Sequence, residues 1–539
     1  MTTIERQFQL DTRIGSLTPS SSVSSTTLDV SRSRQLIYPG SPPNPTMVSD
    51  LEKQPPTNTV DRRLNVTNNE REDKKDPFLV EINGTDDPDH PWNLPQWRKW
   101  VAVLIVSGSS ACVTCTSSIG SSTYAGIERD LNLSPEVAIL SITMFVFGLA
   151  LGPLLLGPIS EFQGRNRVYY GAFGCFFLFN IPVAFANNAP VHFIFRFLSG
   201  FVGAAFLSVA GGTVSDLFPN NKLGTPMAVY STSPFFGPVL GPVIGGFINQ
   251  NTSWRWSYYM VMIWSFIQFI ALVIFAPETH GPTLLRWKAA RIRKQTGDDR
   301  YYAQSEREEK SFIHSLSKSV LIPFKLNTME PMAILLNLWV SCLLAVLYLE
   351  FNSFPIVFGE LHDFSQQESG LSFIGIALGI LGASATGPIW KRLYLRDQTA
   401  HGGSAPPESR LYSGMLGAIL VPISLFLFAG TSVKSVHWIV PIIMSIPFGV
   451  GLVLIFTSVF TFLVDAYRPF AASALSANCF MRCALAGGFP LFASQMYDRI
   501  GIVGAGCVLG GIMTLLAPLP FVFYKYGARI RATSKFAVN

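Results

Sequence analysis

The chain has 539 residues, of which 49% are hydrophobic and only 14% are charged, and its formal net charge is +6. Soluble domains carry about 25% charged residues, so this composition excludes an ordinary soluble protein. Apolar runs follow one another from Trp100 onward, and a helix needs roughly 20 apolar residues to cross a bilayer. The sequence therefore predicts an all-α polytopic membrane protein.

The first segment, residues 1–95, is rich in Ser, Thr, Pro and charged residues. Such a composition cannot bury enough apolar surface to offset the entropy of the chain. We therefore predict a disordered cytosolic N-terminal tail.

Twelve membrane spans are predicted after this tail, as six spans, a connector and six more spans. The predicted parts are an N-terminal six-helix bundle over 96–277, a cytosolic connector over 278–329, a C-terminal six-helix bundle over 330–525 and a cytosolic tail over 526–539. The spans are expected at 99–123, 136–159, 168–187, 190–214, 223–248, 255–276, 331–357, 367–388, 411–430, 437–464, 472–495 and 501–524.

The placement of Lys and Arg in the loops predicts the orientation, because cytosolic loops carry an excess of these residues. With the N-terminus in the cytosol, the outside loops hold only Arg129, Arg255, Lys434 and Arg499, and the inside loops hold the rest. Both termini are therefore predicted to be cytosolic. The plasma membrane is the default location, with a vacuolar or vesicular membrane also compatible. Glycosylation of Asn132 or Asn251, both in outside loops, is left open.

Few ionisable residues lie within the spans, because each costs at least about 2.5–3.5 kcal/mol at the middle of a membrane helix. Arg196 lies in the fourth span, Glu350 in the outer part of the seventh and Arg482 in the eleventh. A structural ion pair or a hydrogen bond to a helix end would account for either arginine, and Glu350 could simply reach the outer headgroups. The alternative is that all three serve ion coupling.

The fifth span carries small residues and prolines at regular spacing, within STSPFFGPVLGPVIGGF. Small residues let another helix approach closely, and proline bends a helix. The eighth span has a similar stripe that begins at Gly375 and Gly379. We expect the two stripes to form surfaces on which two bundles slide, with static packing as the alternative. The fifth-span motif consists of Gly237, Pro238, Gly241, Pro242 and Gly245.

The loop between the second and third spans reads GPISEFQGRNR. Its charged side chains can pair with helix ends or with the facing bundle. Basic residues alone would mark any cytosolic loop, so the fixed spacing carries the information. The residues of this loop motif are Gly157, Glu161, Gly164, Arg165 and Arg167.

Taken together, these motifs resemble those of the major facilitator superfamily, and within it the fungal twelve-span drug:proton antiporter branch. GPISEFQGRNR is similar to the loop motif of that superfamily. The segment RFLSGFVGAAFLSVAGGTVSDLF resembles its fourth-helix motif, with Arg196, Gly200 and Asp216 at the matching positions. GPVLGPVIGG resembles the antiporter signature of helix five, and TGPIWKR is an echo of the loop motif in the second half.

This resemblance implies two six-helix bundles that rock around a central cavity and expose it alternately to each side. It implies that Glu161 and Arg165 latch the cytosolic side in the outward-open state. Arg196 would tune a proton-binding carboxylate or hold a buried network, with Glu350 as the candidate carboxylate and Arg482 as a further member. The resemblance also implies a mostly apolar cavity, for which the candidate residues are Phe206, Tyr348, Phe351 and Asn478.

The predicted function is a proton-coupled efflux antiporter for drugs, toxins or secondary metabolites. The alternative is an importer or facilitator of a small nutrient such as a polyamine, sugar or vitamin. A receptor that binds without transport is a third possibility. We expect protons, a small organic substrate and the lipid bilayer as partners, a monomer, and no nucleic acid.

The sequence lacks the signatures of an enzyme or of a nucleotide-driven pump. Its seven histidines are scattered and its seven cysteines lie within apolar runs, where a packing role is expected,. It also contains no G-x-x-x-x-G-K-(S/T) loop,. We therefore expect no enzymatic activity, no cofactor and no metal.

Overall fold

The computed structural model describes residues 76–81, 87, 89–219, 222–307, 312–402, 405–532, 534, 536 and 537, with the backbone alone at 312–319. All of them belong to one unit, Asp76–Asn539. The predicted disordered tail therefore lies largely outside the described residues. Within them, strand pairing is limited to one β-bridge between Leu79 and Tyr302, and the rest is helix, turn and loop.

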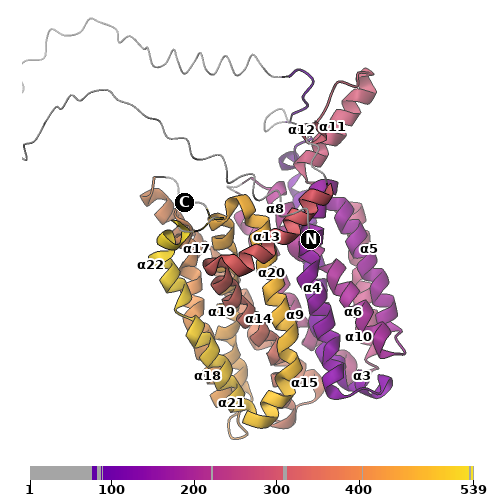
Figure 1. Ribbon diagram of the computed structural model, residues 1–539. Helices are drawn as coiled ribbons and strands as arrows, with labels where there is room; N and C mark the ends of the chain where they lie inside the picture. The colour runs from indigo at the N-terminus through magenta and orange to yellow at the C-terminus, as the bar shows by residue number, and fades with distance from the viewer. Residues whose placement is uncertain are drawn as a thin grey trace, which may run out of the picture. The chain divides into compact units, whose positions relative to one another are not determined.

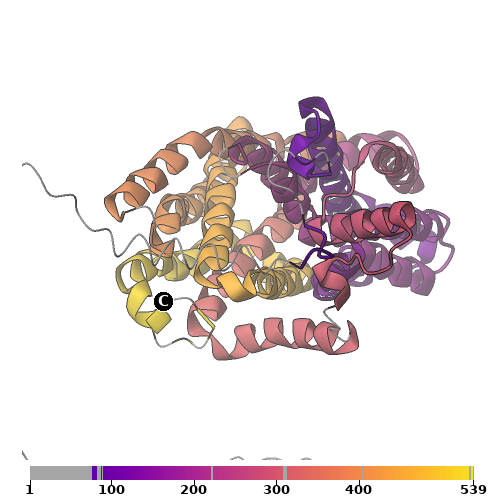
Figure 2. The same cartoon turned by 90° about the horizontal axis from the view of Figure 1, so that it is seen from above.

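The first half of the membrane region forms six helical legs, which gather on one side of this unit (Figures 1 and 2). Local chemistry sets their ends: the side chain of Asn188 caps the fourth leg by accepting from the amide of Val191 at 3.1 Å,. The legs are α2 (Gln96–Ser118), α4 (Pro135–Gln163), α5 (Arg165–Ala184), the series α6 (Ala189–Gly203), α7 (Ala205–Ser208) and α8 (Ala210–Leu217), then α9 (Gly224–Asn251) and α10 (Arg255–Phe275); the short α3 (Tyr124–Leu131) precedes α4.

The second half gathers on the other side and repeats the pattern (Figures 1 and 2). Its legs are α14 (Pro331–Phe354), which continues as a π-helical turn (Pro355–Glu360), the series α15 (Gln366–Leu371), α16 (Ile374–Ala385) and α17 (Gly387–Ala400), then α18 (Tyr412–Thr431), α19 (Ile439–Ala466), α20 (Ala471–Gly488), α21 (Ala493–Leu516) and α22 (Leu519–Ala532).

Nine segments of the described chain are long and apolar enough to cross a membrane, and the twelve predicted spans are all helical. The difference has physical causes. Helix α5 begins with charged and polar residues, and α9 is rich in Gly, Pro and Ser, so neither is counted among the nine. The ninth segment, Arg468–Ala532, contains the last two predicted spans, which are joined at Gly501, where φ is 69°.

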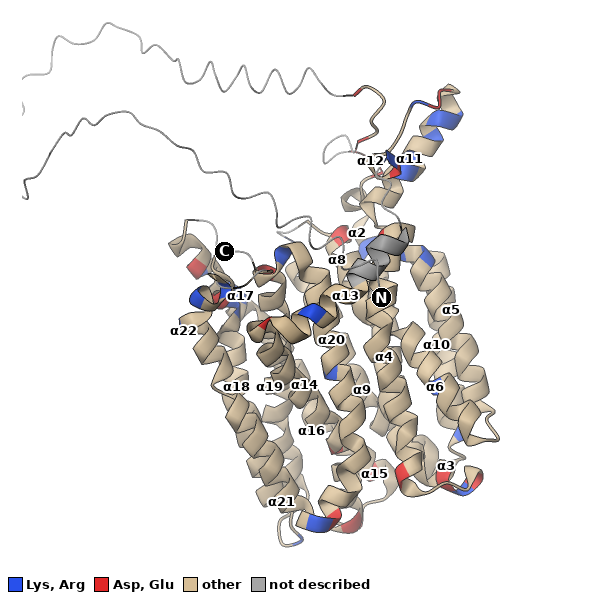
Figure 3. Ribbon diagram, in the orientation of Figure 1, with Lys and Arg blue, Asp and Glu red and all other residues tan. Residues whose placement is uncertain are grey.

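Charged residues gather at the two ends of the legs and are scarce between them (Figure 3), as expected for helices whose middle lies in hydrocarbon. Helices α11, α13, α17 and α22 lie at one end of the legs, and α3 and α15 lie at the other (Figure 1). We call these the connector end and the distal end.

The segment between the halves contains α11 (Gly281–Thr296), α12 (Gln304–Arg307) and α13 (Phe312–Met329). Residues from the predicted tail pack on it. The amide of Val80 donates to the carbonyl of Tyr302 at 2.9 Å, and Lys288 pairs with Asp87 at 2.5 Å. The chain just before the first leg therefore has a defined place on the connector.

The glycine stripe of α9 does not face the other half, contrary to our expectation. A Cβ atom at Gly241 would lie 2.7 Å from the amide nitrogen of Ile119, and one at Gly237 would lie 2.6 Å from the carbonyl of Ala111. Both contacts are with the leg that begins with α2, in the same half. The eighth-span stripe behaves likewise, because a Cβ at Gly379 would lie 2.9 Å from the amide of Val450 in α19. These stripes therefore lock legs together inside each half.

Replacing Gly241 by Ala or Leu is expected to lower the amount of folded protein, because the new side chain would overlap the backbone of the first leg. Overpacking of this kind costs about 1–3 kcal/mol, and more where the neighbour is backbone. The measurement is the monodisperse fraction and melting temperature of the detergent-solubilised variant. Gly382, which has open space around its Cβ position, provides the matched control; equal behaviour of the two alanine variants would contradict the prediction.

Candidate functional site

The loop between α4 and α5 is held by an acidic side chain that follows the sixth leg. Gly164 turns the chain with a φ of 93°, a conformation that favours glycine,. The amides of Arg165 and Asn166 donate to the carboxylate of Glu278 at 3.0 and 3.1 Å, and the two amides after Glu278 donate to it at 2.9 Å each. A Cβ at Gly164 would lie 2.6 Å from this carboxylate. Four amides thus bind one buried anion, and only glycine leaves room for it.

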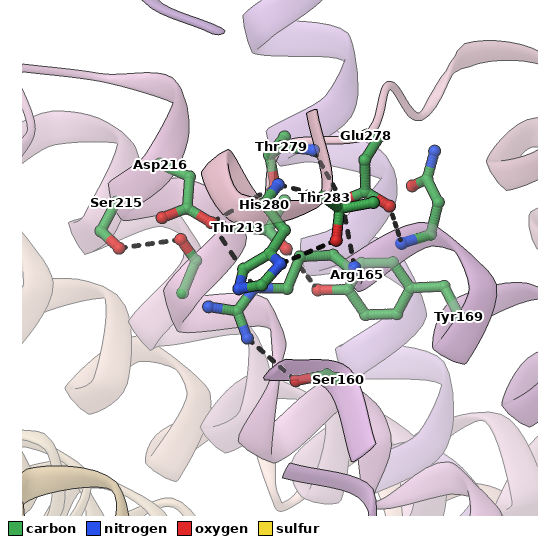
Figure 4. Close-up of polar contacts among 12 residues, drawn as sticks. Ser160, Arg165, Tyr169, Thr213, Ser215, Asp216, Glu278, Thr279, His280 and Thr283 are labelled. Atoms are coloured by element: carbon green, nitrogen blue, oxygen red, sulfur yellow. Dashed lines mark hydrogen bonds and ion pairs between the residues drawn. The ribbon is translucent and has the colours of Figure 1, made fainter. Parts of the chain in front are cut away.

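The side chain of Arg165 joins three legs at the connector end (Figure 4). Its Nη1 donates to Oγ of Ser160 at 2.9 Å, and its Nε lies 3.5 Å from Oδ2 of Asp216 at the end of α8. The predicted loop motif is therefore anchored within the first half through Arg165 and Gly164.

The remaining loop-motif residues are not engaged in the same way. Glu161 and Arg167 are exposed and make no ion pair within the described part of the chain, and Gly157 has open space at its Cβ position. Their predicted part in a latch stays a prediction. Our sequence reasoning gave no role to Glu278; the available signal was an acidic residue placed directly after an apolar span, in Pro-Glu-Thr.

His280 is buried beside this cluster, where its Nδ1 lies 2.9 Å from Oγ1 of Thr283. Burial lowers the pKa of His280 to about 4, with a further lowering by Arg165 that Glu278 opposes. Between pH 6.5 and 4 the unfolded chain therefore binds a proton that the folded chain does not, and stability falls as the pH falls,.

Acidification from about pH 7 to pH 5 is expected to lower the melting temperature of the wild-type protein more than that of His280→Gln. The comparison is made by thermal unfolding of the purified protein at both pH values. The exposed His401 provides the control His401→Gln, which should follow the wild type. A His280→Gln variant with the same pH dependence as the wild type would refute this role for burial.

Arg196 is fully buried in α6 and ties three legs together. Its Nε donates to the carbonyl of Ser141, and its Nη1 donates to the carbonyl of Thr116, both at 2.9 Å. Its guanidinium lies 4.5 Å from the ring centroid of Phe145 and 5.5 Å from that of Tyr258. Nη2 has no hydrogen-bond partner among the described residues.

Glu350 is 5% exposed in α14, and its Oε2 also has no hydrogen-bond partner in the described part of the chain. No hydrogen bond or ion pair joins Glu350 to Arg196 there. The predicted tuning of this carboxylate by Arg196 therefore stays a prediction without direct contact. Glu350 nonetheless lies deep in its leg, where a carboxylate is costly.

Arg482 lies in α20 and is only partly buried. Its Nη2 donates to the sulfur of Cys479 at 3.5 Å, and its guanidinium lies 5.0 and 5.6 Å from the ring centroids of Phe460 and Phe456. Its Nε has no hydrogen-bond partner among the described residues.

The predicted cavity residues lie in different surroundings. The hydroxyl of Tyr348 is 2.7 Å from Oγ of Ser117, so this pair joins the two halves. Phe351 is buried against Tyr348, with ring centroids 5.2 Å apart, and Asn478 donates to Asn337 at 2.9 Å.

Phe206 lies inside the first half, stacked on Tyr169 with ring centroids 4.9 Å apart. Of the four candidates, Tyr348 is therefore the one whose contact lies between the halves.

One set of contacts between the halves lies at the distal end. Gln366, at the start of α15, donates from its amide to Oε1 of Gln250 at 3.1 Å and from its side chain to the carbonyl of Ser122 at 2.7 Å. A Cβ at Gly246 would lie 2.7 Å from the carbonyl of Gln366. We call Ser122, Gly246, Gln250 and Gln366 the distal seam.

Nearer the connector end, the halves share a hydrogen bond of 2.8 Å between Thr232 and Ser384. The rings of Phe235 and Phe456 also meet there, with centroids 4.6 Å apart.

We compared the chain with a family model and with proteins of known name. Residues 106–490 match the family model described as Major Facilitator Superfamily. The chain is 46% identical over 466 residues to "Efflux pump atB" of Aspergillus terreus, covering 85% of this chain and 90% of that protein. It is 38% identical to "Probable drug/proton antiporter YHK8" of Saccharomyces cerevisiae, covering 88% of this chain and 93% of that protein.

Among solved structures, the fold is similar to that of the E. coli xylose transporter XylE in a partially occluded inward open conformation. The TM-score is 0.55 at 15% sequence identity, and the match covers 80% of this chain and 98% of that one. A family model that matches most of the membrane region, together with relatives that match over nearly their whole length, shows that this chain belongs to the Major Facilitator Superfamily.

Proposed function

We propose that this protein is a proton-coupled efflux antiporter, which exports small organic molecules by alternating access. The observation that carries the proposal is its similarity, over 85% and 88% of the chain, to proteins named as an efflux pump and as a probable drug/proton antiporter. The names of these relatives do not favour the alternative of nutrient import. Transport itself is the property of the family, and not catalysis.

The orientation we propose places the connector end in the cytosol, with both termini on that side and the plasma membrane as the location. The connector 278–329 then joins bundles 96–277 and 330–525, and the tail 526–539 is cytosolic. The distal seam would close the outer side, so the structure would correspond to an inward-facing state. A monomer in the lipid bilayer suffices for this mechanism.

The gating proposal follows from the anchored loop. Glu278 and Asp216 hold Arg165 on the first half, which leaves Glu161 and Arg167 exposed at the connector end. These two charges are placed to pair with the second half when the cytosolic side closes. The loop motif would thereby stabilise the outward-facing state.

We propose Glu350 as the proton carrier, because it is the carboxylate that lies deep in a leg within the described chain and because one of its oxygens is unpartnered there. Protonation would remove its charge before the halves rearrange. Arg196 would hold the first half together by its carbonyl contacts, without pairing to this carboxylate.

The proposal is tested in inside-out membrane vesicles from a pump-depleted fungal host. Uptake of a toxic compound, chosen from a growth-inhibition panel, is measured with and without an imposed pH gradient. Wild-type vesicles should accumulate the compound only when the pH gradient is imposed. In Glu350→Gln vesicles, uptake should be the same with and without the pH gradient. The exposed Glu360 gives the matched control Glu360→Gln. Uptake that ignores the gradient in the wild type would eliminate proton coupling.

A further inference from the structure

Two arginines, Arg196 and Arg482, lie deep in the membrane region, and neither has a carboxylate partner among the described residues. Arg196 donates to the backbone carbonyls of Ser141 and Thr116. Arg482 donates to the sulfur of Cys479.

Neither arginine forms an ion pair among the described residues, and each keeps one guanidinium nitrogen without a hydrogen-bond partner there. A buried cation normally has a partner, because an unpaired charge in a membrane is costly.

Arg482 lies where the two halves meet. It is carried by α20, which packs against α4 of the first half: the sulfur of Cys479, one turn before Arg482, lies 4.0 Å from the carbonyl of Leu149. The ring of Phe456, whose centroid lies 5.6 Å from the guanidinium, also meets the ring of Phe235 in α9 of the first half, with ring centroids 4.6 Å apart. The guanidinium therefore points among legs of both halves and not into lipid.

The hydroxyl of Tyr348 hydrogen-bonds that of Ser117 between the two halves, at 2.7 Å. Each half thus carries one of the two guanidinium groups, and hydroxyls of Tyr348 and Ser117 lie between the halves. Among the described residues, Glu350 forms no hydrogen bond or ion pair with either arginine.

We propose that Arg482 is a substrate-binding residue and that the exported molecules are organic anions, carrying a carboxylate or an acidic phenolate on an apolar, ring-containing body. This inference rests on the proposed function and adds the class of substrate. The planar guanidinium suits a carboxylate, to which it can donate two parallel hydrogen bonds. The rings of Phe456 and Phe460, which already lie beside the guanidinium, suit the apolar body. Arg196 adds positive potential from the first half.

The test uses matched acid and amide compounds, which differ in charge but hardly in shape. A pump-depleted host expressing the full chain is exposed to 2-naphthoic acid, to 2-naphthamide and to the permanent cation rhodamine 6G. We expect protection against the acid to exceed protection against the amide. Arg482→Gln should lose this protection by about 10- to 100-fold in effective affinity, the range for one charge-assisted hydrogen bond. Arg482→Lys should retain part of it.

Controls separate binding from folding. Arg468 is an exposed arginine of the same half, so Arg468→Gln should behave as the wild type. The surface amount of each variant is measured by a fluorescent fusion. In proteoliposomes, replacing chloride by gluconate should leave naphthoate transport unchanged, which distinguishes an organic anion from chloride as the partner of Arg482.

The results that would overturn the anion proposal differ from the result that would count against export. Equal protection against acid and amide, or unchanged acid protection in a well-expressed Arg482→Gln variant, would overturn the anion proposal. Protection against rhodamine 6G alone would also overturn it, while leaving export in place. Loss of acid selectivity on adding chloride would assign the site to an inorganic ion and overturn it as well. Protection against none of the three compounds would count against export itself.

Discussion

Cross-linking cysteines placed at Gln250 and Gln366 is expected to reduce transport to the level of an empty vector, and reduction of the cross-link should restore it. The amide of Gln366 lies 3.1 Å from the side chain of Gln250 across the distal seam. A covalent bridge there would hold the halves together, and alternating access needs them to separate at each end in turn. The measurement is substrate efflux before and after a short thiol-cleavable cross-linker, in a background without the native cysteines.

The control for this experiment is a cross-link within one half at similar depth. Asn249 donates to Ser257 at 2.8 Å, and both belong to the first half. Cysteines at these two positions should cross-link without stopping transport. Full activity of the cross-linked Gln250–Gln366 protein would show that the distal seam does not open during the cycle.

Replacing Glu278 by Ala is expected to have the largest effect on stability among the loop substitutions. It removes a buried carboxylate that accepts from four amides, and hydrogen bonds to charged groups are strong. We expect a loss of about 3–5 kcal/mol, the range for breaking a buried charged interaction. The measurement is chemical or thermal unfolding of the purified protein, together with its transport rate.

Glu161→Ala provides the contrast to Glu278→Ala. Glu161 is exposed and unpaired within the described chain, so its removal should leave the melting temperature unchanged. Transport should slow, because the outward-facing state, in which the cytosolic side is closed, would lose a stabilising contact. If Glu161→Ala were destabilising and Glu278→Ala were neutral, the assignment of anchor and latch would be reversed.

Much of the fold could be predicted from the sequence, because each helix that crosses the hydrocarbon needs about 20 mostly apolar residues. The third and fifth spans were predicted too, because each is an apolar run of helix-spanning length between polar breaks. The partner of Glu278 could not be predicted, because its four amides come from two loops more than a hundred residues apart. Every residue except proline has a backbone N–H group, so the sequence does not show which of these groups will bind a carboxylate.

The candidate site was harder to predict than the fold. Arg196 and Arg482 stand out in the sequence because a charged residue within a membrane helix is energetically costly. Their surroundings, however, depend on the orientation of each helix about its own axis, which the sequence does not give. The same limit applies to Gly241: a stripe of small residues indicates close approach, but it does not say to which helix. Rotation of α9 by a fraction of a turn decides whether the stripe contacts α2 or the second half.

Gly245 and Gly246 are neighbours in α9, but they pack against different halves of the protein. A Cβ at Gly245 would meet Ser122 of its own half at 2.8 Å, whereas one at Gly246 would meet Gln366 of the opposite half. Enlarging the first residue should reduce how much protein reaches the membrane. Enlarging the second should leave that amount intact and change how fast each molecule turns over. Yield and speed can therefore be altered separately at two consecutive positions of one helix.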